Sequence, residues 1–357
     1  MNRYSDLFFL TFVVAAVLTP LLRQFALRFN ILDHPKQHGI HERPVARIGG
    51  AAIYLAFILG ALFRMDLSDP LKGVLVGSSL VFIAGFIDDA IRLRASLKLA
   101  VHVLACFLMI FRYGVILHVF PYPILNVFFT ALGIIGITNA VNFLDNMDGL
   151  AAGLVAISSL AIFWIAMISH QPWLGYLTIS LAGASLGFLI WNLRKAHLFR
   201  GDAGANFLGF TLASLAVMTE WSYEWPVRIS VPMLILGVPI LDMFLITILR
   251  AKENKVHNIK EWIDYTGKDH LSHRLMRLGL GTRGAVLALW LLQVLFCGVA
   301  FWIFPRSFAI GVAGLAFYLF TIGAFIAFFR RRRIMLLHLS GRRDLRDLKI
   351  PQTVDSK

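Results

Sequence analysis

The chain has 357 residues, of which 58% are hydrophobic and only 15% charged, and its mean hydropathy is +0.74. About a quarter of the residues in a soluble globular domain are charged, so this composition excludes an ordinary soluble domain. The formal net charge of +14 at pH 7 suits either nucleic acid or anionic lipid, and the placement of the basic residues decides between them.

Eleven apolar segments follow one another along the chain. A helix needs roughly 20 apolar residues to cross the hydrocarbon core of a bilayer, and the absence of strand-like alternation favours helices over a barrel. The first segment resembles the core of a signal peptide, but ten more follow without a convincing cleavage site, so we treat it as a span. We therefore predict an all-α, polytopic helical membrane bundle of about eleven spans. Their centres lie near Val14, Leu55, Leu80, Ala105, Gly133, Ala161, Leu181, Ala213, Ile240, Leu295 and Phe317.

The basic residues lie mainly in turns on one predicted side of the membrane. These turns hold 28 of the 34 Lys and Arg residues, and the positive-inside rule makes this side cytoplasmic. The amino terminus is then outside and the carboxyl terminus inside, as eleven spans require. Loops beside anionic lipid account for the charge, so we predict membrane lipids and no nucleic acid as partners. The turns are residues 23–47, 88–98, 194–200, 250–283 and 330–357.

Acidic residues gather on the same predicted side, which holds 15 of the 20 Asp and Glu. An aspartate costs about 2.5–3.5 kcal/mol at the bilayer centre and much less near the headgroups. Acids at the ends of spans can therefore stay ionised beside an apolar lipid tail, which suits chemistry between a water-soluble substrate and a membrane lipid. Three such clusters are GFIDDAIRLRASLK (85–98), NAVNFLDNMDGL (139–150) and HLFRGDAGANFLGF (197–210).

In the second cluster, Asn139, Asn142, Asp145 and Asp148 fall at every third position. An α-helix turns about 300° over three residues, so neighbours share a face while the row drifts. We expect Asn142 and Asp145 to face one ligand. Gly149 would then break the helix and let Asp148 reach another part of that ligand. The alternative, a helix end capped by Asn and Asp, explains one or two of these residues better than four.

The other two clusters also have plainer explanations. A surface pair of Asp88 with Arg92 explains Asp88 and leaves the adjacent Asp89 unexplained. Asp202, which follows Gly201, could cap the next span, or its glycine-flanked loop could approach a phosphate closely. Three acidic clusters on one side favour a Mg²⁺–phosphate site, because Mg²⁺ is typically held by one or two carboxylates plus substrate phosphates.

The longest predicted cytoplasmic loop ends in KDHLSHRLMRLGLGTRG (268–284). Its basic residues are spaced by three and four and share a helix face: His270, His273, Arg274 and Arg277. A basic amphipathic helix lying on the membrane is one interpretation. The alternative interpretation is that these basic side chains face an anionic substrate, and that the histidines transfer protons.

Six blocks in order carry a family resemblance. They resemble the polyprenyl-phosphate N-acetylhexosamine-1-phosphate transferases, which start O-antigen, teichoic-acid and related glycans and have the phospho-muramoyl-pentapeptide translocase as a cousin. The blocks are DHPKQHGIHERPVARIGG (33–50), GFIDD followed by Lys98, NAVNFLDNMDGLAAG (139–153), WN…FRGDAG (191–204), VPILD (238–242) and DHLSHRL (269–275).

The resemblance implies an enzyme of the bacterial inner membrane with its active site on the cytoplasmic face. Such enzymes join a cytoplasmic nucleotide-sugar, usually a UDP-N-acetylhexosamine, to polyprenyl phosphate, release UMP and leave a lipid-linked diphosphate sugar. The implied cofactor is Mg²⁺, with Mn²⁺ as a substitute. Residues 1–329 would form a single catalytic membrane domain and residues 330–357 a basic cytoplasmic tail. Whether the protein forms a homodimer stays open.

The resemblance also implies roles for the charged residues. Asp202 corresponds to the main Mg²⁺ ligand, with Asn142 as a helper. Asp88 and Asp89 would handle the lipid phosphate or its proton, and Lys98 would neutralise a phosphate. From the residues alone, Lys98 would be an ordinary interfacial anchor.

The remaining implied roles concern the nucleotide-sugar. Asp145 would support the diphosphate site. The uridine would be held by Asp148, Asn192 and Phe199, although Phe199 alone would be interpreted as a lipid-facing aromatic. Contacts to the diphosphate or sugar would come from His270, His273 and Arg274.

Three positions depart from the family pattern. His38 and Gly39 stand where an Arg-Lys pair is common, so we expect Arg43 or Arg47 to substitute in phosphate contacts. Ser272 replaces the middle histidine of a His-x-His-His block. The muramoyl branch carries three consecutive histidines and a glutamate near Asp242, so the simpler N-acetylhexosamine branch fits better. Asp242 itself could stabilise the bundle through a polar contact.

Two other functions compete with this one. A secondary transporter would place ionisable residues near the midplane, often with an internal repeat, but here the acids lie at one interface. A non-catalytic protein that binds polyprenyl lipids needs the cations and has little use for three acidic clusters. Among enzyme mechanisms, we expect direct attack of the lipid phosphate, because no separately activated nucleophile is evident.

Overall fold

The computed structural model describes residues 2–29, 32–33, 45–46, 48–64, 68–193, 201–258, 261, 265, 267 and 269–339. These residues are helical almost throughout, so the predicted all-α class is confirmed. The two strands, β1 (Leu32–Asp33) and β2 (Val45–Ala46), pair antiparallel over two residues each.

The helices follow the apolar segments of the sequence. Their bounds are α1 Asn2–Arg28, α2 Gly49–Arg64, α3 Asp69–Ile91, α4 Ala95–Phe107 with a π-helical turn Leu108–Arg112, α5 Pro123–Leu144, α6 Leu150–Ile168, α7 Pro172–Asn192, α8 Gly201–Met218, α9 Trp225–Ile235, α10 Gly237–Lys252, α12 Leu271–Leu275 with a π-helical turn Met276–Leu280, α13 Gly281–Ile303 and α14 Phe308–Leu339.

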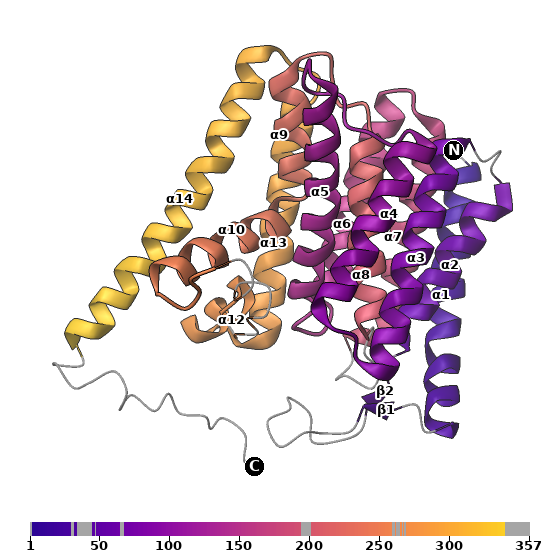
Figure 1. The fold of residues 1–357 in the computed structure, drawn as a ribbon, viewed down its shortest axis with the longest axis horizontal. Coiled ribbons are helices and arrows are strands. Elements are labelled where there is room, and N and C mark those ends of the chain that lie inside the picture. Colours follow the sequence, from indigo (N-terminus) through magenta and orange to yellow (C-terminus); the bar gives the residue numbers. More distant parts are fainter. Residues whose placement is uncertain are drawn as a thin grey trace.

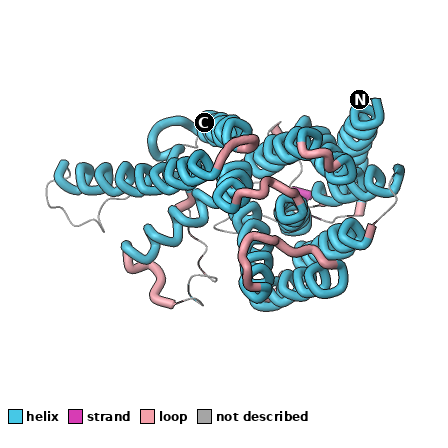
Figure 2. The backbone as a smooth tube through the Cα atoms, turned by 90° about the horizontal axis from the view of Figure 1, so that it is seen from above, coloured by secondary structure: helices cyan, strands magenta, loops and turns pink. Residues whose placement is uncertain are grey.

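Helices α1 to α8 pack side by side as one bundle, and α14 leans away from it (Figure 1). The closest helix pairs include α1 with α7, α6 with α7, α3 with α8 and α5 with α8. Figure 2, seen from above, shows many of the helices nearly end-on. Helix α1 begins at the upper end of Figure 1 and α14 ends at the lower end. The predicted orientation makes this lower end cytoplasmic.

The chain is a multi-pass membrane protein. Among the described residues, eight helices are long and apolar enough to cross a membrane, and the pair α9–α10 adds a ninth if it is counted as one broken span. Helix α2 is a shorter apolar helix, and α8 has 18 residues including Asp202 and Asn206. These two, with the other nine, correspond to the eleven predicted segments, whose number and orientation stay predictions.

The segment centred on Ile240 is sharply bent. Helices α9 and α10 meet at an angle of 84°, with Leu236 between them. Pro232 inside α9 and Gly237 at the start of α10 flank the bend, and proline and glycine are the usual causes of such breaks. The bend turns α10 sideways, away from the direction of α9 and toward α14 (Figure 1).

The last helix is longer than the sequence analysis predicted. Helix α14 continues to Leu339, so the predicted boundary between residues 329 and 330 falls within a helix. Residues 340–357 lie outside the described part of the chain.

Candidate functional site

Lys98 joins two acidic clusters that are far apart in the sequence. Its Nζ lies 2.9 Å from Asp88 Oδ2 and 2.7 Å from Asp202 Oδ2. These residues come from the last turn of α3 and the first turns of α4 and α8. Asp88 is buried, and its other carboxylate oxygen accepts a hydrogen bond from the Leu93 backbone N–H. A buried carboxylate is costly unless it is paired and hydrogen-bonded, so Lys98 stabilises the site as well as assembling it.

Asp89 binds the start of α8 from the neighbouring helix. Its two carboxylate oxygens accept hydrogen bonds from the backbone N–H groups of Asp202, at 2.9 Å, and Ala203, at 3.1 Å. A helix leaves its first four N–H groups unpaired. Asp89 therefore caps the start of α8, a role that the sequence analysis considered for Asp202. Gly85, one turn earlier, lets α3 approach α8, because a Cβ there would lie 2.5 Å from Ala203 Cα.

Asp145 lies at about the same depth as Asp202. Helix α8 packs against α5 where Gly209 meets Thr138, since a Cβ on Gly209 would lie 2.8 Å from Thr138 Cα. Asp202 precedes Gly209 by seven residues, and Asp145 follows Thr138 by seven. The two helices run in opposite directions, so both acids lie about 10 Å from this contact toward the same end. The acidic clusters therefore converge at one end of the bundle, as predicted.

The turn after α5 differs from the prediction. Helix α5 ends at Leu144, Asp145 is its C-cap, and the next residues form turns. The break expected at Gly149 is therefore present, but it begins earlier, at Asp145. Gly149 adopts a left-handed φ of +80° before α6 begins, a conformation that glycine adopts without strain.

Asn192 holds this turn in place. Its Oδ1 accepts a hydrogen bond from the Gly149 backbone N–H at 2.7 Å, and the side chain is buried at the end of α7. Asn192 thus orients the segment that carries Asp145 and Asp148. Its predicted contact with uridine stays a prediction.

A buried pair connects α10 with the histidine block. His270 Nδ1 lies 2.7 Å from Asp242 Oδ2, and Asp242 Oδ1 accepts a hydrogen bond from the Leu271 backbone N–H at 2.6 Å. Asp242 is 1% exposed. The polar contact suggested for Asp242 is thus present. Its partner is His270, which the sequence analysis expected to contact the diphosphate or sugar.

A second buried pair lies beside it. Arg250 of α10 forms two hydrogen bonds to the Asp269 carboxylate, at 2.9 and 2.7 Å, and stacks over the Tyr265 ring. Burial alone would raise the pKa of Asp269, but the Arg250 guanidinium outweighs it and holds this pKa below its usual range. Asp269 is therefore ionised at neutral pH.

The histidine block is not one amphipathic helix. Helix α12 begins at Leu271, so His270 precedes it, and the π-helical turn from Met276 follows. The shared face predicted for the four basic residues is thus interrupted. Ser272 is fully buried, and its Oγ donates to Asn146 Oδ1 at 2.8 Å. This hydrogen bond attaches the block to the acidic turn after α5.

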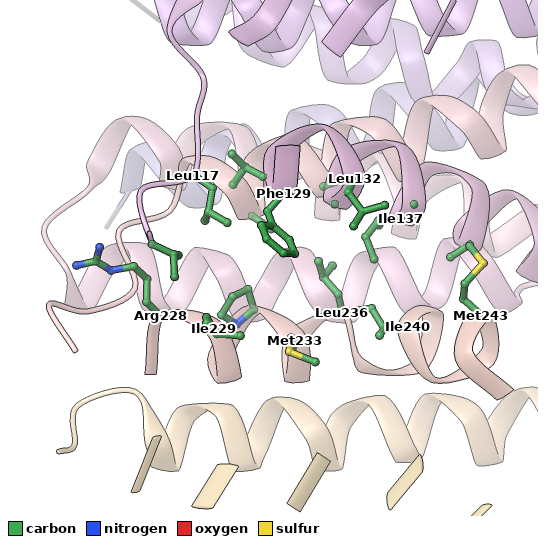
Figure 3. Close-up of a pocket in the computed structure, with 18 of the residues that line it drawn as sticks. Leu117, Phe129, Leu132, Ile137, Arg228, Ile229, Met233, Leu236, Ile240 and Met243 are labelled. Carbon is green, nitrogen blue, oxygen red and sulfur yellow. The ribbon is translucent and has the colours of Figure 1, made fainter. Parts of the chain in front are cut away.

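A mostly apolar pocket of about 410 Å³ opens between α5, α8 and the bent pair α9–α10 (Figure 3). Phe129 and Leu132 of α5 face Met233 and Leu236 at the bend, and Arg228 lies at one end. Ile240 and Met243 lie toward the end opposite Arg228 (Figure 3), and Ala140 and Phe244 also line the pocket. Ala140 is two residues from Asn142 on α5, so the pocket leads toward the acidic turn.

The structure places most of the predicted site residues at this one end. Asn142, Asp148, His273 and Arg274 are partly buried there, and the Arg274 Nε donates to the Asp269 carbonyl at 2.7 Å. Three predicted contacts lie outside the described residues: Phe199, Arg43 and Arg47.

Sequence reasoning missed two anchors, Arg250 and Asn146. Arg250 had a signal that could have found it, because it lies eight residues after Asp242 on an apolar helix and so on the same face. Asn146 is one polar residue among several in its turn, and nothing in its spacing singled it out.

The described residues contain no group of three or more His, Cys, Asp or Glu side chains that could hold a metal ion. Mg²⁺ needs fewer protein ligands, typically one or two carboxylates with substrate phosphates and water. The Asp202 side chain is 35% exposed at the Lys98 cluster, so the donors present fit such an open site and do not fit a closed metal cage.

Comparison with known proteins identifies the family of the chain. A model of the family described as glycosyl transferase family 4 matches residues 71–220, the segment that carries Asp88 through Asp202. A "Probable undecaprenyl-phosphate N-acetylglucosaminyl 1-phosphate transferase" of Bacillus subtilis (strain 168) is 30% identical over 306 residues, covering 83% of this chain and 84% of its own length. The chain belongs to glycosyl transferase family 4.

Other proteins similar to this glycosyl transferase family 4 chain have related names. A "Decaprenyl-phosphate N-acetylglucosaminephosphotransferase" of Mycolicibacterium smegmatis is 28% identical over 365 residues, with 89% of this chain and 87% of its own covered. A "Phospho-N-acetylmuramoyl-pentapeptide-transferase" of Streptococcus pneumoniae serotype 19F (strain G54) is 31% identical over 237 residues, with 59% and 73% covered. These matches favour an enzyme over the transporter and the non-catalytic lipid binder.

Proposed function

We propose that this protein transfers a sugar-1-phosphate, from a UDP-N-acetylhexosamine, to polyprenyl phosphate, releasing UMP and leaving a lipid-linked diphosphate sugar. The observation that carries the proposal is the Lys98 ammonium held between Asp88 and Asp202 at the end of the bundle toward which an apolar pocket leads. The names of the similar proteins support the same reaction class.

The apolar pocket suits the hydrocarbon tail of the acceptor. Nearly all its lining residues are apolar, and a polyprenyl chain has no polar group that would need a partner there. A tail in this pocket would put its phosphate near the end of α5, where Asn142 and Asp145 lie. The bent pair α9–α10 forms one wall of the pocket.

The reaction must bring an anionic phosphate onto an anionic diphosphate. Each like-charged contact near 4 Å opposes this by about 4 kcal/mol at an effective dielectric constant of 20. Lys98 and Arg274 supply cationic groups at the end where the substrates would meet, and His273 lies beside them. Positioning and charge stabilisation are the main tasks of a protein in phosphoryl transfer, and this set of side chains suits them.

The proposed cofactor is Mg²⁺, with Asp202 as its ligand and Asn142 as a helper. When bound, Mg²⁺ would offset the charge of the nucleotide diphosphate. Asp89 contributes by holding the Asp202 backbone, and Lys98 by holding its carboxylate. Asp88 would orient Lys98 toward the lipid phosphate.

In the proposed step, an oxygen of the lipid phosphate attacks the phosphorus that carries the sugar. A new P–O bond forms to the lipid phosphate, and the bond from that phosphorus to the oxygen of UMP breaks. The electron pair leaves with UMP, so no covalent enzyme intermediate is needed. The acids and cations of the described site can serve this in-line attack without an activated nucleophile.

The positive-inside charge distribution supports a cytoplasmic site in a bacterial inner membrane, where a nucleotide-sugar is available. The test uses purified protein, polyprenyl phosphate, Mg²⁺ and a panel of UDP-sugars, with UMP release as the readout. We expect release with at least one UDP-N-acetylhexosamine and loss of Mg²⁺-dependent release in Asp202→Asn. Asp69→Asn, a matched change in an exposed acid outside the site, should be as active as the unchanged protein. No release with any UDP-N-acetylhexosamine would contradict the proposal.

A further inference from the structure

Four consecutive residues, Asp269 to Ser272, are each anchored to another part of the chain. Asp269 is held by Arg250, and Ser272 by Asn146. Between them, the His270 ring and the Leu271 backbone N–H are both held by Asp242. Such a segment is fixed before any substrate arrives, which lowers the cost of orienting its groups in a reaction.

Asp242 is the anchor that holds two of these residues, and its carboxylate is deeply buried. It is 1% exposed, and a carboxylate so deeply buried is strongly unfavourable unless both oxygens find donors. Both oxygens have a partner: His270 Nδ1 lies 2.7 Å from one, and the Leu271 backbone N–H donates to the other at 2.6 Å. A carboxylate accepts hydrogen bonds, so the arrangement proposed below has the proton of the first contact on His270 Nδ1.

We propose that Asp242 is a positioning residue, which fixes the tautomer and the ring orientation of His270. With Nδ1 committed to Asp242, Nε2 is the ring nitrogen left to meet a substrate oxygen or accept a proton. The ring is further confined by Phe143, whose centroid lies 5.7 Å away with the planes at 45°. Phe143 is two residues before Asp145, so the oriented ring stands beside the acidic turn.

The orientation of the His270 ring is inferred from geometry alone. The effect of that orientation on turnover rests on the proposed function. If His270 touches the diphosphate or sugar, losing its orientation lowers kcat while the KM for the UDP-sugar changes little. Replacing the carboxylate that orients a metal-binding histidine typically costs roughly 10–100-fold, and we expect a loss of the same order for His270. Asp242 has no other side-chain partner among the described contacts, so its effect should pass through His270.

The first test reads the ring directly and needs no turnover. Protein labelled with ¹⁵N-histidine is measured by NMR in detergent, and the spectrum of His270→Gln assigns the signal. We expect Nδ1 of His270 to be protonated, and Asp242→Asn to move that proton to Nε2. A protonated Nε2 with bare Nδ1 in the unchanged protein, or an unaltered ring signal in Asp242→Asn, would overturn the inference.

The second test is a double-mutant cycle on kcat. Asp242→Asn should lose roughly 10–100-fold, and combining it with His270→Gln should cost no more than His270→Gln alone. Asp242→Glu, which keeps the charge, should retain more turnover than Asp242→Asn and also replaces it if that variant does not fold. Losses that simply multiply would show that Asp242 does not act through His270. A protein with the expected ring signal but no UMP release would instead reject the proposed function, so the two failures are distinguishable.

Discussion

Lys98 on α4 and Asp202 on α8 are 104 residues apart in the sequence, and the Nζ of one lies 2.7 Å from the Oδ2 of the other. The same ammonium contacts Asp88 on α3. Removing it would leave two carboxylates facing each other without the cation between them.

Lys98→Met should lower kcat/KM by about 10²–10³-fold, the cost of losing one well-placed group that stabilises developing charge. Lys98→Arg keeps the charge and should lose less. The measurement is UMP release, with Lys72→Met as the matched control. Lys72 pairs with Asp69 on an exposed surface, and such pairs contribute little. Near-normal turnover in Lys98→Met would contradict the site described above.

Asp89→Ala should destabilise the start of α8. The change removes the acceptors of two backbone N–H groups, and losing a capping side chain costs about 0.5–2 kcal/mol. We expect a lower Tm in detergent together with reduced turnover, because Asp202 lies in the released turn. Asp89→Asn keeps one acceptor oxygen and should be intermediate. An unchanged Tm in Asp89→Ala would rule out this capping role.

Gly85→Ala should separate α3 from α8. The added Cβ would lie 2.5 Å from Ala203 Cα, a backbone atom that cannot move by itself. Both Tm and turnover should fall. Gly298→Ala on α13 is the matched control, because a Cβ there meets nothing within 4 Å and alanine has the higher helix propensity. If both variants behave alike, the close approach is not important.

Gly136→Leu should obstruct the apolar pocket. Gly136 lines it, and a Cβ there meets nothing within 4 Å, so the side chain can enter the cavity. The KM for polyprenyl phosphate should rise roughly tenfold, equivalent to losing about 1.4 kcal/mol of contact, while the KM for the UDP-sugar stays unchanged. Gly323→Leu on α14, also in open space, is the control. If only the KM for the UDP-sugar rises, the pocket binds the nucleotide-sugar and not the polyprenyl tail, which would contradict the proposal.

The Arg250–Asp269 pair should make stability depend on pH. Because Arg250 holds the pKa of Asp269 below its usual range, the pair stabilises the fold above the ordinary aspartate pKa of about 4, and this contribution is lost as the pH falls toward the lowered pKa. The Tm difference between the unchanged protein and Asp269→Asn should therefore shrink in acid. Arg250→Met, which leaves a buried charge unpaired, should cost roughly 3–5 kcal/mol. A Tm difference that is constant with pH would contradict the pairing.

Local properties of the sequence were enough to predict the class of fold. Each apolar run between turns forms a helix, because a helix pairs its backbone N–H and C=O groups within one segment and leaves few of them exposed to lipid. The bend between Ile235 and Gly237 and the early end of α5 at Leu144 were less accessible. Both depend on where a helix stops, which packing decides as much as composition does.

The candidate site divides in the same way. Spacing and residue type identified Asp88, Asp202 and Lys98 as charged groups at the ends of spans, because a charge in an apolar chain must lie near water or a partner. The partners themselves came only from the tertiary structure. Asp89 meets the backbone of α8, and Asp242 meets His270, across 113 and 28 residues of sequence. A hydrogen bond requires its donor and acceptor to be placed within a few tenths of an ångström of the right distance. Only the packing of whole helices gives that precision.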